Sequence, residues 1–106
     1  MGIDDDLLRE IVRRLVAVAE VERIVLFGSA ATGKMTRDSD IDLLVIEKSA
    51  GDARRESVRL RAALRGMGYP LDVIVMSAEE FEESKNVIGG VAYPANKYGR
   101  VIYEAA

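Results

Sequence analysis

The feature that most constrains the fold is a pair of apolar runs, rich in β-branched residues and joined by a short polar segment. The first run, Val21–Phe27, ends at Gly28-Ser29, and the second, Ile41–Glu47, begins directly after Asp40. Short runs of this composition, bounded by glycine and polar residues, predict β-strands. Because side chains along a strand point alternately to opposite faces, Asp40 and Asp42 share a face, about 7 Å apart along the backbone. The sequence therefore predicts two neighbouring carboxylates beside a glycine turn.

Two carboxylates side by side predict a bound cation. Like charges disfavour each other's ionised form unless a positive charge lies between them. Mg²⁺ supplies that charge, and it usually takes only one or two protein carboxylates and completes its shell with water and substrate phosphates. The predicted ligand is therefore a nucleoside triphosphate with magnesium. Gly28 has no Cβ, so a phosphate can approach the backbone there, and the amides of Ser29 and Ala30 and the Ser29 hydroxyl can donate hydrogen bonds to it.

A third acid, Asp72, stands near the start of another apolar run, residues 71–76. A carboxylate in an otherwise buried strand is costly unless it is paired or bound to a metal. Three such acids can hold two metals about 3.5–4 Å apart, one on the triphosphate and one on the attacking hydroxyl. The alternative for Asp72 is an ion pair with one of the nearby arginines.

Two other readings of the same segment fail. Residues 28–35 match the P-loop pattern GxxxxGK[ST] except at the last position, where Met35 has no hydroxyl for magnesium. A P-loop must also open a helix, and only a few residues separate Lys34 from the second predicted strand. An EF-hand loop is rejected because Leu43 stands where glycine is required and Ser49 where the bidentate glutamate belongs.

A purely structural explanation of the motif is the remaining alternative. In that case Gly28 only ends a strand, Ser29 caps a helical turn, and the two aspartates are solvated at a sheet edge. Short motif matches by themselves carry a large false-positive risk. The agreement of spacing, strand context and third acid favours the nucleotide site.

The pattern GSx10DxD with a later strand aspartate resembles the DNA polymerase beta superfamily, and specifically the minimal nucleotidyltransferases often encoded beside HEPN-domain proteins. The resemblance spans most of the chain. It covers a leading helix, the strand ending at Gly28-Ser29, the block from Asp38 to Val45, the strand around Asp72 and the closing segment 99–104.

This resemblance implies transfer of AMP from ATP to a hydroxyl, with two Mg²⁺ ions. Asp40 and Asp42 would bind both metals, Asp72 would complete the second metal site and help deprotonate the nucleophile, and Gly28 and Ser29 would hold phosphate oxygens. The implied acceptor is a tyrosine of a HEPN-domain toxin, with this chain as the antitoxin.

The loop after Ser29 departs from the family pattern. Relatives often read GSxARGxxRxxSDxD, whereas this chain has Ala30, Ala31 and Thr32 before Gly33 and a threonine at the second arginine position. Lys34 and Arg37 lie in the same loop and are the predicted substitutes as phosphate contacts. The missing arginines also favour the rival interpretation, a non-catalytic antitoxin that binds nucleotide and neutralises its partner by forming a stoichiometric complex.

Composition limits the chemistry that the chain can perform. Its 106 residues fit one domain over residues 1–106, which can bury close to two-thirds of its unfolded surface. It has no cysteine and no histidine, so carboxylates must carry any catalysis. A net charge of −3 argues against strong nucleic-acid binding by the chain alone. No apolar run approaches a membrane span, and the acidic N-terminus is unlike a secretory signal, so we expect a cytoplasmic protein.

Apolar periodicity and capping signals extend the fold prediction along the chain. We expect helices over residues 5–20, after Asp52 and over residues 79–85, with Ser77 and Glu80 forming a capping box. The predicted order is αββαβα plus a C-terminal strand. Adjacent strands without strict βαβ alternation predict an α+β fold, a mixed sheet flanked by helices, and the resemblance implies the polymerase-beta-like palm of nucleotidyltransferases.

Two further segments carry open alternatives. The second long helix is basic, which predicts a solvated face rather than a docking surface for an acidic partner. Its arginines are Arg54, Arg55, Arg59, Arg61 and Arg65. The segment 87–96 is apolar and interrupted by glycines, so we expect it to fold onto the sheet, with exposure as an interface the alternative. Pro94 would kink or start a helix there.

Overall fold

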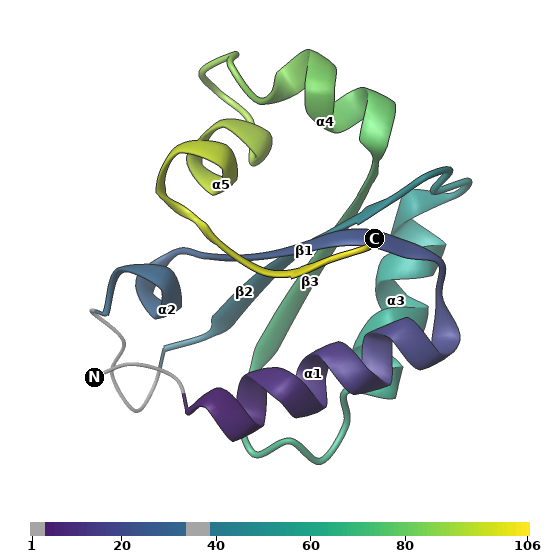
Figure 1. Ribbon diagram of the computed structural model, residues 1–106, viewed down its shortest axis with the longest axis vertical. Coiled ribbons are helices and arrows are strands. Elements are labelled where there is room, and N and C mark those ends of the chain that lie inside the picture. The colour runs from purple at the N-terminus through teal and green to yellow at the C-terminus, as the bar shows by residue number, and fades with distance from the viewer. Residues whose placement is uncertain (1–3, 34–38) are drawn as a thin grey trace.

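A mixed four-stranded sheet forms the centre of the protein (Figure 1). The computed structural model describes residues 4–33 and 39–106. Its elements are α1 (Asp5–Val18), β1 (Val21–Phe27), α2 (Ser29–Thr32), β2 (Ile41–Glu47), α3 (Ala53–Ala63), β3 (Leu71–Ser77), α4 (Ala78–Ser84), α5 (Ala92–Tyr98) and β4 (Arg100–Glu104). The strand order is β3-β2-β1-β4, with β1 antiparallel to β2 and β4 and with β2 parallel to β3. The predicted α+β fold is confirmed.

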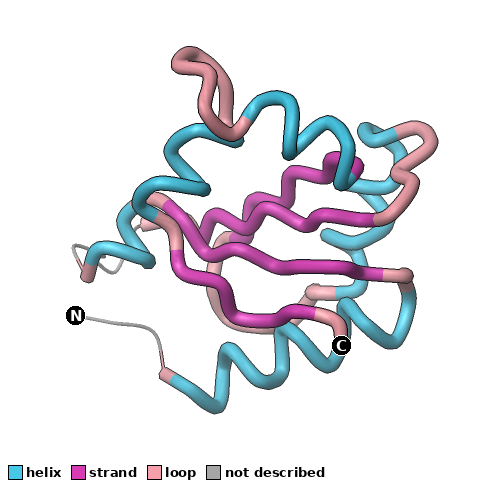
Figure 2. The backbone as a smooth tube through the Cα atoms, turned by 45° about the horizontal axis from the view of Figure 1, so that its top comes forward, coloured by secondary structure: helices cyan, strands magenta, loops and turns pink. Residues whose placement is uncertain are grey.

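Helices cover both faces of this sheet (Figure 2). α1 and α3 lie on one face, and α4 and α5 lie on the other. β2 is buried between the two layers: Ile41, Leu43 and Val45 pack toward α1 and α3, whereas Leu44 and Ile46 pack toward α4 and α5. A strand covered on both faces is expected to be apolar along almost its whole length, as β2 is.

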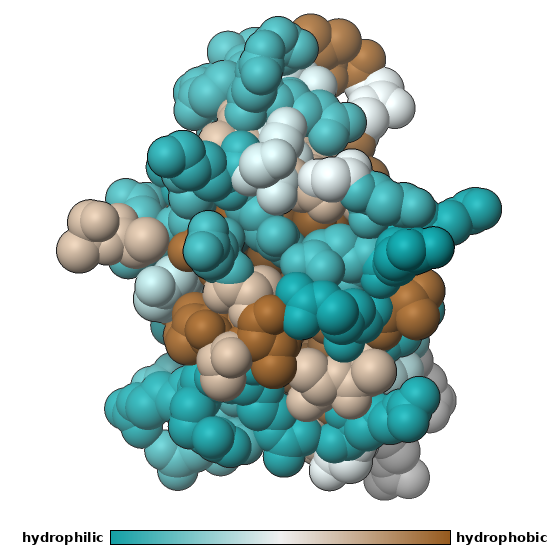
Figure 3. All heavy atoms as spheres, turned by 90° about the vertical axis from the view of Figure 1, so that its right-hand side faces the viewer, coloured by the Kyte–Doolittle hydropathy of each residue, from teal (hydrophilic) through white to brown (hydrophobic). Residues whose placement is uncertain are grey.

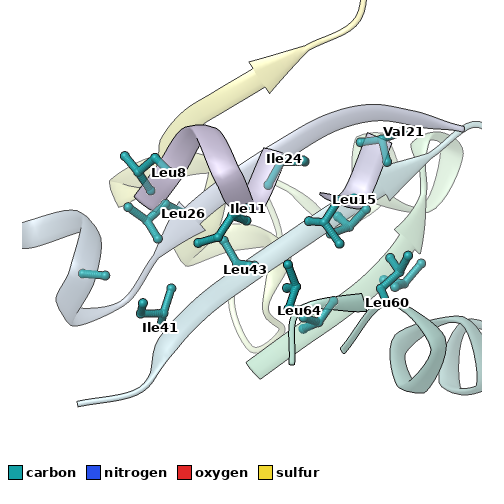
Figure 4. Packing of buried hydrophobic residues seen from close by; sticks show 14 residues of the cluster. Leu8, Ile11, Leu15, Val21, Ile24, Leu26, Ile41, Leu43, Leu60 and Leu64 are labelled. Carbon is teal, nitrogen blue, oxygen red and sulfur yellow. The ribbon is translucent and has the colours of Figure 1, made fainter. Parts of the chain in front are cut away.

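The larger of the two cores lies beneath α1 and α3 (Figure 4). Leu8, Ile11 and Leu15, spaced by three and four residues on α1, are fully or almost fully buried there, as are Leu60 of α3 and Leu64 directly after it. Truncating such a side chain to alanine typically costs about 2–5 kcal/mol, so this layer fixes α1 and α3 against the sheet.

The first helix is shorter than predicted, but its capping agrees with its acidic start. Asp4 caps α1 by accepting a hydrogen bond from the amide of Asp6 at 2.8 Å. The helix ends at Val18 rather than residue 20, because Ala19 is already extended and the chain must turn into β1 at Val21. In residues 4–33 and 39–106, no helix has the length and apolar character needed to cross a membrane.

Two helices were absent from the predicted order. α2 is a single turn directly after Gly28, and α5 forms in the apolar tail with Pro94 in its first turn, where an N–H is not needed. Ala92 and Ala95 of α5 are buried against the sheet, as expected. The start of the tail is different, because Val87 and Ile88 are 60% and 80% exposed.

Candidate functional site

The sheet register brings two of the three predicted acids together. Asp42, the second residue of β2, pairs with Phe27 at the end of β1 on one side and with Asp72 of β3 on the other. Residues paired in register on neighbouring strands project to the same face. Asp42 and Asp72 therefore lie side by side, next to the turn at Gly28.

The two acids lie on the sheet face that α4 and α5 cover, at a part of it that these helices leave open. Asp42 shares its face of β2 with Leu44 and Ile46, which are buried under the layer of α4 and α5. Asp42 itself is half-buried and Asp72 is exposed. Asp40 lies two residues earlier, just before β2 begins, and is exposed. The acids are thus the solvent-accessible end of a sheet face that is otherwise apolar.

The backbone at position 28 favours glycine, and a side chain there would have to displace the carboxylate of Asp42. The backbone of Gly28 has φ 71°, a left-handed conformation that residues with a Cβ rarely adopt. A Cβ built at this position would also overlap the Oδ2 atom of Asp42. The chain then enters the single turn of α2 at Ser29. The amide of Ala31 donates to the carbonyl of Gly28 at 3.1 Å, so the amides of Ser29 and Ala30 are the ones without an acceptor within the helix. This places backbone donors beside the Asp42 carboxylate, as the sequence predicts for a phosphate site.

Repulsion among the acids is visible at Asp42. Burial raises the pKa of its carboxyl group, and the negative charges of Asp72 and Asp40 raise it further. A bound cation would relieve both effects, because it favours the ionised form of each neighbouring carboxylate.

Asp72 has a cationic partner within the chain. Nη2 of Arg61, on α3, lies 3.3 Å from Oδ1 of Asp72, and the two side chains are 52% and 50% exposed. The predicted alternative for Asp72, an ion pair with a nearby arginine, is therefore present in this structure. A pair this exposed is worth at most about 1 kcal/mol, so a divalent cation can compete for the carboxylate.

The donor set fits a magnesium ion in its chemistry, although it is not a preformed cage. Within the described ranges, no group of three or more acidic side chains is close enough to hold a metal ion. The nearest arrangement is the pair Asp42 and Asp72, with Asp40 close enough to influence the pKa of Asp42. Mg²⁺ commonly uses one or two protein carboxylates and takes its other ligands from water and phosphates, which this pair can accommodate.

The predicted phosphate contacts are only partly described. Gly28 and Ser29 lie at the junction of β1 and α2, beside Asp42. Lys34 and Arg37 lie outside the described residues, so their assignment as phosphate contacts stays a prediction.

Sequence reasoning did not single out Arg61, which it treated as one of five arginines on a basic helix. The predicted solvated face does not fully describe these arginines, because two of them bind other groups of the protein. Arg61 pairs with Asp72, and Arg59 binds Glu56 and the carbonyl of Val18. The one signal in the sequence was the expectation that Asp72 could pair with a nearby arginine.

Comparisons with known proteins agree with this geometry. The sequence model of the nucleotidyltransferase domain matches residues 6–93. Among solved structures, a protein from Sulfolobus solfataricus provisionally assigned as a nucleotidyltransferase is 22% identical with a TM-score of 0.65, covering 94% of this chain and 79% of that one. A toxin-antitoxin structure with AMP-PNP is 19% identical with a TM-score of 0.63, covering 97% of this chain and 75% of that one. The toxin-antitoxin MntA-HepT is 17% identical with a TM-score of 0.61, covering 96% and 74%. A search of curated protein sequences gave no match.

The likeness to these structures extends over almost the whole chain, and at such low identities it establishes the fold. The sequence model establishes more, since it matches most of the chain, including the Gly28 turn and all three acids. The chain therefore belongs to the nucleotidyltransferase domain family.

Proposed function

We propose that this protein transfers AMP from ATP to a hydroxyl group of a macromolecular acceptor, in a reaction that depends on Mg²⁺. The observation that carries the proposal is the register pair of Asp42 and Asp72 beside Gly28, whose Cβ-free backbone leaves room for the Asp42 carboxylate. Membership of the nucleotidyltransferase domain family supports it.

The proposal gives each residue of the site a role, which the family resemblance supports. Asp40, Asp42 and Asp72 would hold up to two Mg²⁺ ions, which neutralise the triphosphate and lower the pKa of the acceptor hydroxyl. The hydroxyl of Ser29 and the amides of Ser29 and Ala30 would bind phosphate oxygens. The acceptor oxygen forms a bond to the α-phosphorus, the bond from that phosphorus to the bridging oxygen breaks, and pyrophosphate leaves. Once the ion pair between Arg61 and Asp72 has opened, the carboxylate of Asp72 accepts the proton of the hydroxyl.

The proposed acceptor is a tyrosine of a HEPN-domain toxin, with this chain acting as the antitoxin. The support is the resemblance of the motifs to minimal nucleotidyltransferases and the presence of toxin-antitoxin structures among the similar folds, one of them with AMP-PNP. A tyrosine hydroxyl is an adequate nucleophile only when it is deprotonated during the reaction, which is the role given to Asp72.

Incubation with ATP labelled at the α-phosphate, Mg²⁺ and the protein encoded beside this chain tests the proposal. We expect covalent label on that protein, located on a tyrosine by mass spectrometry, and none with Asp42→Asn. Glu83→Gln, on the exposed surface of α4, is the matched control and should label normally. Failure of the wild-type protein to label any partner with any nucleoside triphosphate or divalent metal would refute a transferase.

A non-catalytic antitoxin is the second candidate, and the Arg61–Asp72 ion pair favours it, because a metal must displace Arg61 before it can bind Asp72. In that case the double variant Asp40→Asn with Asp42→Asn still protects cells from the partner and still forms a complex with it. A transferase loses protection in the same variant while it remains folded.

A further inference from the structure

A groove of about 460 Å³ lies between α3 and the outer edge of β3. The helix contributes Arg54, Val58 and Arg61 to its lining, and the strand contributes residues 72–75. Asp72 therefore belongs both to this groove and to the candidate nucleotide site. A molecule bound in the groove lies beside the carboxylate that the proposed reaction needs.

The outer edge of β3 is closed to a further strand. In residues 4–33 and 39–106, β3 pairs only with β2, so no strand covers its other edge. Val73 and Val75 are nevertheless only 1% and 5% exposed, and the carbonyl of Val73 accepts a hydrogen bond from the hydroxyl of Ser57 on α3. A helix that covers an edge strand in this way prevents the addition of another strand. A molecule in the groove must therefore be recognised by side chains.

The side chains available for recognition form a row on α3. Arg54, Val58 and Arg61 are four and three residues apart, so they share one face of the helix. Val58 is 60% exposed, which places an apolar side chain between the two arginines. The row is about 10 Å long, which equals about three residues of an extended chain. The side of the molecule on which α3 lies shows apolar side chains set among hydrophilic ones (Figure 3).

The positive charge of the groove increases when a metal binds. Among the described residues, Arg54 has no ion pair and Arg61 has Asp72 as its one partner, at 3.3 Å. A divalent cation that takes Asp72 leaves Arg61 without that partner. Two guanidinium groups then face the groove with no carboxylate of this chain to bind, and a guanidinium binds a carboxylate strongly. The groove thus favours an acidic molecule from outside.

A protein segment fits this groove better than a nucleic acid does. Proteins that bind single-stranded nucleic acid combine a positively charged groove with aromatic side chains on which the bases stack. The described lining contains two cations and no aromatic ring, and its centre is the apolar Val58 above buried valines of β3. The net charge of −3 also opposes the attraction of a polyanion. Acidic and apolar side chains close together are characteristic of a protein.

We propose that this groove binds an extended acidic segment of the acceptor protein, next to the residue that receives AMP. One carboxylate of the segment takes Arg61 away from Asp72, a second pairs with Arg54, and an apolar side chain contacts Val58. Asp72 is then free for its role at the nucleotide site, so acceptor and metal favour each other's binding. The identity of the occupant rests on the proposed transferase function. The inference adds the class of acceptor, a hydroxyl with acidic and apolar residues close to it in sequence.

Binding of two synthetic peptides to the full chain tests this proposal without a transfer step. One peptide has a central tyrosine flanked by glutamates and a leucine, and in the other peptide glutamine replaces every glutamate. With Mg²⁺ and α,β-methylene ATP, which cannot release pyrophosphate, calorimetry should show about tenfold tighter binding of the acidic peptide. Arg54→Gln should remove most of this difference. Arg55→Gln, exposed on the same helix but outside the groove, should bind as wild type.

A Mn²⁺ titration followed by electron paramagnetic resonance tests the exchange at Arg61. The acidic peptide should increase the Mn²⁺ affinity of the wild-type protein about threefold, because it removes Arg61 from Asp72. It should not change the Mn²⁺ affinity of Arg61→Gln, in which Asp72 has already lost this partner. The first measurement uses wild-type protein alone, so it remains decisive if a variant folds poorly.

Three results would overturn the proposal: equal binding of the two peptides, an acidic preference that Arg54→Gln leaves intact, or a Mn²⁺ affinity that the acidic peptide does not change. Tighter binding of an oligoadenylate of equal charge would assign the groove to nucleic acid and overturn it as well. The transferase assay fails independently of these results. AMP transfer without any acidic preference in binding refutes the role of the groove alone. Acidic-peptide binding with the Mn²⁺ effect, but without transfer to any partner, supports the groove and refutes the transferase.

Discussion

Glu47 gives this fold a stability that depends on pH in a predictable direction. In the unfolded chain its carboxyl group loses a proton near the ordinary pKa of 4.5, whereas in the folded protein burial and the neighbouring Glu56 raise the pKa to about 7. Between these two values the folded protein holds a proton that the unfolded chain has lost. The free energy of unfolding must therefore fall as the pH rises from about 4.5 to about 7, and stay at the lower value above that.

Glu47→Gln removes this loss, because glutamine is neutral at every pH and its amide can donate to Glu56. A pKa change from 4.5 to about 7 corresponds to about 3 kcal/mol at pH 8. We expect the variant to exceed wild type by up to this amount at pH 8, with a melting temperature higher by about 10 °C. Near pH 4.5 the two proteins should be nearly equal, since Glu47 is protonated in the folded state there.

Urea unfolding followed by circular dichroism at several pH values measures this difference, which suits a chain without tryptophan. The pairing of Arg59 with Glu56 is present in both proteins, so its own pH dependence cancels in the difference to first order. Glu83→Gln on the surface of α4 is the control and should show the wild-type profile. If Glu47→Gln is no more stable than wild type at pH 8, or if the difference does not grow between pH 5 and pH 8, the reasoning about this buried carboxylate is wrong.

Three further predictions concern the candidate nucleotide site. Gly28→Ala should lose about 1–2 kcal/mol of stability through its left-handed backbone, and it should also lose the increase in melting temperature that ATP with Mg²⁺ gives to wild type. The control Gly51→Ala is also left-handed but has open space around its Cβ, so it should lose only stability. An equal nucleotide response in both variants would contradict the role of Gly28. Asp42→Asn should stabilise the protein without ligand by up to about 1 kcal/mol at pH 7, because it removes a charge repelled by Asp72 and Asp40, and a destabilised variant in thermal melting would refute this. Arg61→Gln should change the stability by less than about 1 kcal/mol. It should increase the affinity for Mn²⁺, measured in a titration followed by electron paramagnetic resonance. An unchanged affinity would show that Arg61 does not compete with metal for Asp72.

Local signals in the sequence predicted most of the individual elements. β1 and β2 begin and end where their apolar runs predict. The Ser77 cap is also as predicted, since its hydroxyl accepts a hydrogen bond from the amide of Glu80 at 3.1 Å. These features depend on a few neighbouring residues, which is why they can be read from the chain. α2 and α5 were missed because short helices depend on packing more than on propensity.

The candidate site was predictable in its residue types but not in its contacts. The spacing of Asp40 and Asp42 predicts a shared face, but Asp40 lies just before β2 begins. The placement of Asp72 directly beside Asp42 depends on the parallel register of β2 and β3. The approach of Arg61 to Asp72 depends on how α3 packs against β3.

By itself the sequence determined the strands, the glycine turn and the acids that follow it, because each rests on local composition, backbone sterics or the alternation of a single strand. Only the tertiary structure decided which acids are neighbours, which one is paired, and that Glu47 at the far end of β2 is buried. Register, helix packing and burial join residues that are distant in the chain. The pKa of a carboxylate follows its surroundings rather than its place in the sequence, so the chemistry of Asp42 and Glu47 was fixed only when α1, α3 and the sheet came together.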